Sequence, residues 1–310
     1  MTSRQALDTR ASSLMLLLCA LWGLQQVVLK ATAADIAPIM QIALRSGAAA
    51  VLLSLWMWWR KERMHVNDGT LRAGLLVGCL FALEFLLVGE GLRHTSASHA
   101  VVFLYTAPIF VALGLHLKLP SERLGLVQWL GIGLAFAGIV LTFFGRAPQG
   151  RLSDPMMMLW GDALALMAGM LWAATTVVVR CSSLASAPAS QTLMYQLVGA
   201  FVLLLVAALT LGQTHIHFTP GVWASLVFQS VLVSFASFLA WFWLLRHYLA
   251  SRLGVFSFLT PLFGMGFGVW LLDEPLEPRF LLGATLVLAG VMLVSSQGWL
   301  SAARARRART

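Results

Sequence analysis

Charged residues are scarce in this chain. Only 11% of its 310 residues are Asp, Glu, Lys or Arg, whereas ordinary soluble domains carry about 25%. Hydrophobic residues make up 59%, and apolar stretches of roughly 20 residues, each enough to cross a hydrocarbon layer of about 30 Å, recur along the whole length. This composition excludes a soluble domain and predicts an all-α integral membrane protein.

Motifs for enzymatic chemistry, metal binding and ATP hydrolysis are also missing. Cys19, Cys79 and Cys181 show no CxxC spacing and are interpreted as small packed side chains. His215 and His217 have no third ligand at a suitable spacing, and no phosphate-binding loop occurs. We therefore expect no enzyme, no cofactor and no metal. The missing phosphate-binding loop also excludes ATP hydrolysis as an energy source.

The chain contains one pattern twice. The segment 22–41, WGLQQVVLKATAADIAPIMQ, recurs 150 residues later as 172–191, WAATTVVVRCSSLASAPASQ, with its Trp, Pro and terminal Gln in register. A second echo repeats Leu92-Arg93-His94 as Leu245-Arg246-His247. Two echoes in the same order indicate that the chain consists of two copies of one unit.

Each copy contains five apolar spans. The expected spans are 12–32, 38–59, 71–92, 97–117 and 124–144 in the first copy, and 156–180, 189–211, 221–245, 251–272 and 279–296 in the second. A unit that crosses five times ends on the side opposite to its start, so the second copy must be inserted upside down. The sequence therefore predicts ten transmembrane helices as two inverted five-helix repeats.

The connections between spans predict the orientation and the domains. With the N-terminus inside, fifteen Lys and Arg residues face the cytoplasm and five face outward, so both termini are expected to be cytoplasmic. The formal charge of +9 is explained by the basic residues on the cytoplasmic side of the membrane. We therefore expect no nucleic acid partner. The expected domains are the cytoplasmic N-terminus 1–11, repeats 12–147 and 156–298, the external linker 148–155 and the basic cytoplasmic tail 299–310.

Two ionisable residues lie deep in the spans, where a charge is costly and so indicates function. Arg45 and Glu84 both fall roughly 10 to 12 Å below the external surface at 1.5 Å per residue. They could bind the carboxylate and ammonium groups of an amino acid, or pair with each other to fix helix packing. Glu90 and Asp162 lie nearer the external interface, where hydration lowers the cost of a charge.

Aromatic and polar residues also lie in the middle of spans, too deep for an interfacial belt. An aromatic face with neighbouring hydrogen-bonding groups suits an apolar or aromatic solute with a polar head, although these residues could instead pack helices together. The expected cavity lining comprises Trp22, Gln26, Tyr105, Trp172, Thr176 and Tyr195. Pro108 and Pro261 should kink the fourth and ninth helices, as hinges for alternating access or as static bends.

The segments that start at Leu92 and Leu245 carry a family resemblance. LRHTSASHAVVFLYTAPIFVALGLHLKLPSERLGLVQWLGIGLAFAGIVL and LRHYLASRLGVFSFLTPLFGMGFGVWLLDEPLEPRFLLGATLVLAGVML share a Ser/Ala-rich start, a mid-helix proline, an acidic Glu122 or Glu274, and a closing Gly and Ala-Gly helix. They resemble the tandem EamA-type domains of the drug/metabolite transporter superfamily. One departure is Pro-Ser-Glu in the first copy, where Gly-Glu is common, and it affects only a loop.

The resemblance implies a ten-helix permease of the bacterial inner membrane, with its two inverted repeats arranged around a central cavity. Within the superfamily the sequence is most similar to aromatic amino acid exporters. We expect a secondary transporter that exports amino acids, aromatic and neutral ones among them, and related metabolites by alternating access. Its partners would be a small-molecule substrate and the lipid bilayer, with a monomer as the simplest state. The alternative is efflux of toxic or cationic drug-like compounds, for which Glu84 alone would suffice.

Overall fold

The described part of the chain is helical. The computed structural model describes residues 9–64, 69–118, 124–144, 155–247 and 259–295. Within these ranges seven helices are long and apolar enough to cross a membrane, and three shorter apolar helices accompany them. The expected all-α membrane protein is confirmed. Most of both predicted termini and of the linker, together with Glu122, falls outside the described residues, so the ten-span topology and the domain boundaries stay predictions.

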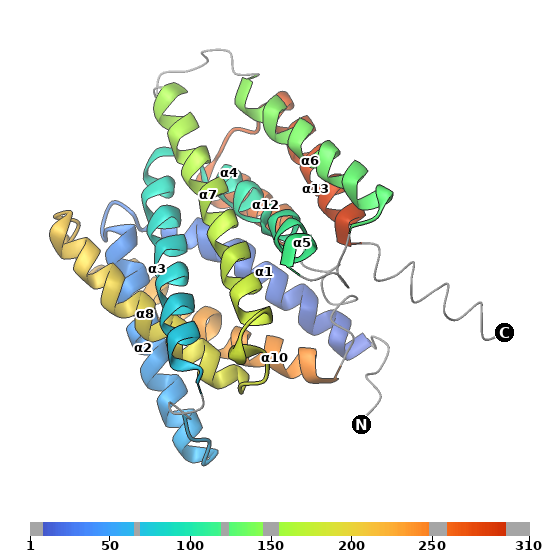
Figure 1. The fold of residues 1–310 in the computed structure, drawn as a ribbon. Coiled ribbons are helices and arrows are strands. Elements are labelled where there is room, and N and C mark those ends of the chain that lie inside the picture. Colours follow the sequence, from blue (N-terminus) through green and yellow to red (C-terminus); the bar gives the residue numbers. More distant parts are fainter. Residues whose placement is uncertain (1–8, 65–68, 119–123, 145–154, 248–258, 296–310) are drawn as a thin grey trace.

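The helices follow the expected spans closely (Figure 1). The first half of the chain forms α1 (Thr9–Ala31), α2 (Pro38–Trp59), α3 (Leu71–His94), α4 (Ala97–Leu104), α5 (Ala107–Lys118) and α6 (Leu126–Phe144). The second half forms α7 (Pro155–Arg180), the 3-10 helix η2 (Ser183–Ala185), α8 (Ala189–Thr210), α9 (Pro220–Val227), the π-helix η3 (Phe228–Ser237), α10 (Phe238–His247), α12 (Leu259–Leu272) and α13 (Pro278–Ser295). Several helices begin at or next to a proline, which needs no N–H partner in the first turn.

The fourth expected span is broken in two. Pro108 lacks the N–H that would bond the carbonyl of Leu104, and α4 ends there. Tyr105 and Thr106 form the turn, in which Thr106 Oγ1 donates to the Phe103 carbonyl at 2.6 Å. Pro261 lies in the first turn of α12, and residues 248–258, which precede this helix, are outside the described ranges. The break at Pro108 is thus observed, whereas the hinge role of both prolines stays a prediction.

The eighth expected span is interrupted by a π-helix, which the sequence did not predict. Residues Phe228–Ser237 form η3 between α9 and α10. A π-helix is rare and widens the backbone, and such segments are frequent at functional sites. Its last residue, Ser237, accepts a hydrogen bond from Trp22 Nε1 of α1 at 2.9 Å. The π-helix is therefore tied to the first copy of the repeat.

Glycines let α6 and α13 approach closely, and the two helices lie side by side in Figure 1. A Cβ added to Gly138 would lie 2.5 Å from the Gly283 carbonyl oxygen and 2.8 Å from the Val287 nitrogen. The backbones of the two helices therefore touch where only glycine fits, as expected for small-residue packing in a membrane. Elsewhere α7 packs along α3 and α5, α2 along α8, and α1 along α12.

Apolar side chains on the outer surface mark the lipid-facing sides of the helices. On α8, Val198, Val202 and Val206 form an exposed stripe with a four-residue period. Cys79 and Cys181 are also exposed, and Cys19 is buried. The expectation that all three cysteines are packed is therefore correct only for Cys19, because Cys79 lies on an exposed face of α3 and Cys181 lies in the exposed turn after α7.

We expect Gly138→Val to destabilise the protein by about 1–3 kcal/mol, because the added side chain would press into the backbone of α13. Gly133→Val on the same helix is the matched control, since a Cβ there meets nothing within 4 Å. Thermal unfolding of the purified proteins measures both. Equal transition temperatures for the two variants would contradict the glycine-mediated contact.

Candidate functional site

A row of hydrogen bonds, which we call the polar ladder, joins α2 and the residues before it to α9 and η3. In each bond the two residues lie 184 positions apart. The three bonds join Asp35 to Thr219, Gln41 to Ser225 and Arg45 to Gln229. The constant separation means that the two segments run in the same direction in register. The ladder descends from the α1–α2 connection, whose end of the molecule we call the external end because the charge count predicts it to face outward.

Arg45 is the innermost donor of the polar ladder. Its side chain is only 2% exposed. Nη1 donates to Gln229 Oε1 at 2.6 Å, and the guanidinium lies over the ring of Phe85, 4.6 Å from the ring centre. Nε is buried and has no hydrogen-bond partner. The Nε edge of a guanidinium is one that a carboxylate can grip with two oxygens, so Arg45 keeps capacity for an anion.

Glu84 is buried near Arg45 but does not bridge to it. It is 4% exposed, and its Oε2 atom has no hydrogen-bond partner. The two charges interact electrostatically. In the described chain, however, the ion pairs with a nitrogen and an oxygen within 4.0 Å involve other residues. The structure thus brings the predicted pair together without joining it.

Gln229 is the site residue that the sequence analysis missed. It is fully buried, and besides accepting from Arg45 it donates through Nε2 to the Gln25 carbonyl at 3.0 Å. A single amide deep in the apolar span 221–245 is a signal in itself, because a buried amide needs partners. Its partner could not be inferred, since Arg45 lies in the other copy of the repeat.

The predicted aromatic residues fall into two groups. Tyr105 and Trp172, from different copies, form an edge-to-face pair with ring centres 5.2 Å apart. Trp22 lies instead against Trp241, with ring centres 5.7 Å apart. Gln26 lies on α1, where its Oε1 atom is buried without a partner. Gln26, like Arg45 and Glu84, therefore has a polar atom available to a ligand.

The other two predicted residues make local contacts. Thr176 Oγ1 donates to the Trp172 carbonyl of its own helix at 3.1 Å. Tyr195 occupies the position in the second copy that Arg45 occupies in the first, since Gln41 matches Gln191. Its hydroxyl lies 3.4 Å from Thr70 Oγ1, at the N-terminus of α3. The contacts of Thr176 and Tyr195 are typical of helix packing. Their roles in substrate binding stay predictions.

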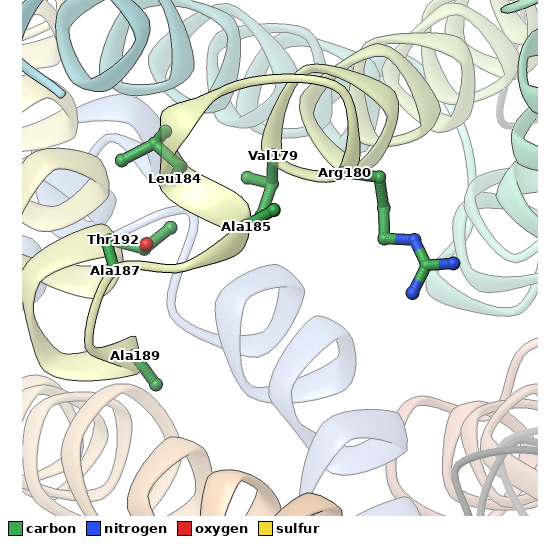
Figure 2. Close-up of a pocket in the computed structure, with 7 residues that line it drawn as sticks. All are labelled: Val179, Arg180, Leu184, Ala185, Ala187, Ala189 and Thr192. Atoms are coloured by element: carbon green, nitrogen blue, oxygen red, sulfur yellow. The ribbon is translucent and has the colours of Figure 1, made fainter. Parts of the chain in front are cut away.

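Two pockets lie at the end of the molecule opposite to the external end. One of about 310 Å³ is formed where α7, η2 and α8 meet (Figure 2). Its lining residues are Val179, Arg180, Leu184, Ala185, Ala187, Ala189 and Thr192. The Arg180 side chain extends away from the η2 residues in Figure 2. The other pocket, of about 500 Å³, is lined by residues 58, 59 and 61–63. Neither is lined by the predicted site residues.

The external end is held together by hydrogen bonds between helix ends. Lys30 Nζ, at the end of α1, donates to the carbonyls of Leu92 and Thr95 at the end of α3, the latter at 2.8 Å. The α1–α2 and α8–α9 connections form an antiparallel bridge between Ile36 and Ile216. These contacts satisfy backbone carbonyls that a helix end leaves free. They also join the two copies at the external end.

A buried Asp–His pair also lies at the external end, and it corrects one sequence interpretation. Asp162 was expected near hydrated surface but is fully buried, because the turn after α3 covers it. Thr95 Oγ1 donates to Asp162 Oδ1, and His99 Nδ1 lies 3.1 Å from Oδ2. His99, isolated in the sequence, stacks on Phe280 with ring centres 3.8 Å apart. The pair connects α4 with α7 and α13.

Glu274 binds the start of α4. Its Oε1 atom accepts from the Ala97 N–H at 2.6 Å, and Oε2 accepts from the Ser98 N–H at 3.0 Å and the Ser98 hydroxyl at 2.6 Å. The first N–H groups of a helix have no partner within the helix, and a carboxylate there also complements the helix dipole. An acidic residue in the second copy thus holds a helix of the first.

Comparison with known proteins identifies the family. A model of the EamA-like transporter family matches the chain over residues 9–144 and again over residues 159–296. The chain belongs to this family. Members of the EamA-like transporter family are named as transporters, and this chain is accordingly a multi-pass membrane transporter and not an enzyme. The family resemblance expected from the two Leu-Arg-His segments is confirmed.

Individual relatives of this EamA-like transporter are distant but cover most of its length. The uncharacterized transporter YoaV of Bacillus subtilis is 24% identical over 275 residues, which span 88% of this chain and 92% of that protein. A protein of Escherichia coli named "Probable amino-acid metabolite efflux pump" is 25% identical and covers 90% and 93%. One solved structure, 16% identical, has a TM-score of 0.65 and covers 98% and 100%. That likeness shows a shared fold.

Glu274→Gln should destabilise the protein by about 1.5–3 kcal/mol, because an amide offers N–H groups where the start of α4 needs acceptors. Glu277→Gln in the same connection is the control, since its described bond uses the backbone carbonyl. Thermal unfolding of both variants tests this, and a loss of stability as large for Glu277→Gln would contradict the assigned role of Glu274.

Proposed function

We propose that this transporter exports amino acids, aromatic and neutral ones among them, and related metabolites across the bacterial inner membrane. The observation that carries this proposal is the buried pair of Arg45 and Glu84, each with an unpartnered polar atom. Unpartnered charges in a membrane interior cost several kcal/mol and are retained where they serve a function. A zwitterion supplies both missing partners, because its carboxylate suits Arg45 and its ammonium group suits Glu84.

The surroundings of the two charges fit a substrate with an apolar side chain. Tyr105 and Trp172 present aromatic surface from both copies, and Gln26 adds an unpartnered amide oxygen. A mostly apolar lining with a few polar groups is the usual composition of a small-molecule site. We include Trp22, Thr176 and Tyr195 in the lining as further predictions.

Alternating access between two inverted repeats would move the substrate. Gln41, in the second helix of the first copy, bonds Ser225 at the external end. Gln191, its counterpart, bonds Thr70 at the opposite end at 2.8 Å. In both cases the acceptor lies at the start of the third helix of the other copy. This pairing supports an inverted arrangement, and the bonded external end supports a conformation closed to the outside.

Efflux of cationic drug-like compounds is the second candidate. It is favoured by the bond between Arg45 and Gln229, which occupies one donor of the guanidinium while Glu84 Oε2 stays unpartnered. A cation would need Glu84 alone. The two candidates differ in whether the substrate requires a carboxylate.

Flux of labelled L-phenylalanine and other amino acids in proteoliposomes tests the proposal. The wild-type protein should transport L-phenylalanine, and Glu84→Gln should reduce transport by about tenfold or more, because a charge-assisted bond is worth about 1.5–3 kcal/mol. Glu90→Gln on the same helix is the control, since Glu90 bonds to Arg93 and Gln213 outside the site. An absence of flux across the panel, or an unchanged rate in Glu84→Gln, would overturn the proposal.

A further inference from the structure

A pocket of about 500 Å³ lies where α2 ends. Its lining comprises two tryptophans of the last helical turn, Trp58 and Trp59, and the charged residues Lys61, Glu62 and Arg63 that follow the helix. The tryptophans are 81% and 73% exposed, and Lys61 and Arg63 are exposed as well. Aromatic surface and positive charge thus lie together at one end of a helix that is long and apolar enough to cross a membrane.

The two basic residues of this pocket, Lys61 and Arg63, are not needed to end the helix. Basic side chains near a helix C-terminus can bond its last carbonyl groups. Here the main chain does this instead, because the N–H groups of residues 60, 61 and 62 donate to the carbonyls of residues 56, 58 and 57 at 2.9, 3.1 and 2.9 Å. In the part of the chain that the structure describes, neither basic side chain makes a hydrogen bond or an ion pair. Both are therefore available to an anion from outside the chain.

The carboxylate of the pocket already has a partner. Glu62 Oε2 accepts a hydrogen bond from Ser190 Oγ of α8 at 2.9 Å. This bond holds the segment after α2 against the start of α8. Two cations and one carboxylate leave the pocket with a net positive charge, and the carboxylate is bonded to a hydroxyl group rather than to either cation. The pocket therefore favours an anionic ligand.

An exposed apolar strip on α2 leads to the pocket. Val51, Leu55 and Trp59 are all exposed and follow one another at intervals of four residues. Residues at this spacing lie on the same face of a helix. A ligand that covers both surfaces has its charged part in the pocket and an apolar chain along α2. A phospholipid has this shape, whereas a free phosphate ion does not.

We propose that the pocket binds the headgroup of an anionic phospholipid, with an acyl chain along the strip formed by Val51, Leu55 and Trp59. Lys61 and Arg63 attract the phosphate, as basic pockets between membrane helices bind acidic headgroups. Trp58 and Trp59 suit the same depth, because tryptophan is enriched where the membrane meets water. The lipid is a bound partner and not the transported substrate, so this site goes beyond the proposed function and does not depend on it.

Equilibrium binding to the purified full-length protein in a neutral detergent tests the proposal. The probe is phosphatidylglycerol with a fluorescent acyl chain. Phosphatidylcholine with the same label is the reference, because its choline group offsets the charge of the phosphate. Phosphatidylglycerol should bind about tenfold more tightly or better, since each basic residue at the headgroup contributes a factor of about five. The double variant Lys61→Asn/Arg63→Gln should lose this preference.

The variants are chosen so that a loss of binding can be assigned to the pocket. Asparagine is tolerated at Lys61, whose φ of 56° lies in the left-handed region. Arg10→Gln/Arg72→Gln is the matched control, because it removes the same charge from exposed residues outside the pocket, and it should leave the Kd within about twofold. Thermal unfolding without lipid establishes that each variant is folded, and Arg63→Gln alone carries the test if the double variant is not.

Three results would overturn the lipid site. Equal Kd values for the two lipids would show that the pocket does not select a negative headgroup. Equal losses in the pocket variant and in the control would assign the effect to the overall charge. Displacement of the labelled lipid by glycerol 3-phosphate as readily as by unlabelled phosphatidylglycerol would indicate a site for a free phosphate ester. All three leave amino acid transport untouched, so a failure here is distinguishable from a failure of the proposed function.

Discussion

A buried guanidinium is the constraint on which the site depends. Arg45 is surrounded by protein in a region that the membrane makes apolar, so its charge must be offset by groups that the fold supplies. The ring of Phe85, the amide of Gln229 and the nearby carboxylate of Glu84 do this only in part. The Nε atom of Arg45 is left without a hydrogen-bond partner. The charge of Arg45 thus connects the helix packing of this protein to the proposed function.

The two copies of the repeat share a frame but differ in their chemistry. Gln41 and Gln191 make equivalent bonds at opposite ends of the molecule. One turn further along, the first copy has Arg45 where the second has Tyr195. Arg45 meets an amide, whereas the ring of Tyr195 packs against Gly74, where no side chain could stand. Duplication therefore supplies the scaffold, and divergence at one matched position supplies the charge.

Helix starts and closely packing helix faces could be predicted from the sequence, and the pairing of particular polar residues between the copies could not. The helix start at Pro38 and the glycine contact of Gly138 follow from proline geometry and small-residue patterns. The pairing of Arg45 with Gln229 could not be predicted from the sequence. It depends on how two helices are aligned, and the two residues lie 184 positions apart in the chain. Asp162 was predicted to lie near water because it is close to the end of its span. The position along a helix does not reveal that the turn after α3 covers this residue. The π-helix likewise has no signal in the apolar pattern.

The central claim is that Arg45 and Glu84 bind the two charged groups of an amino acid. A structure of the full-length protein determined with L-phenylalanine bound tests this most directly. We expect the carboxylate to contact Arg45 through Nε, which has no partner in the described structure, and the ammonium group to contact Glu84. L-phenylalanine bound away from Arg45 and Glu84 would contradict this assignment.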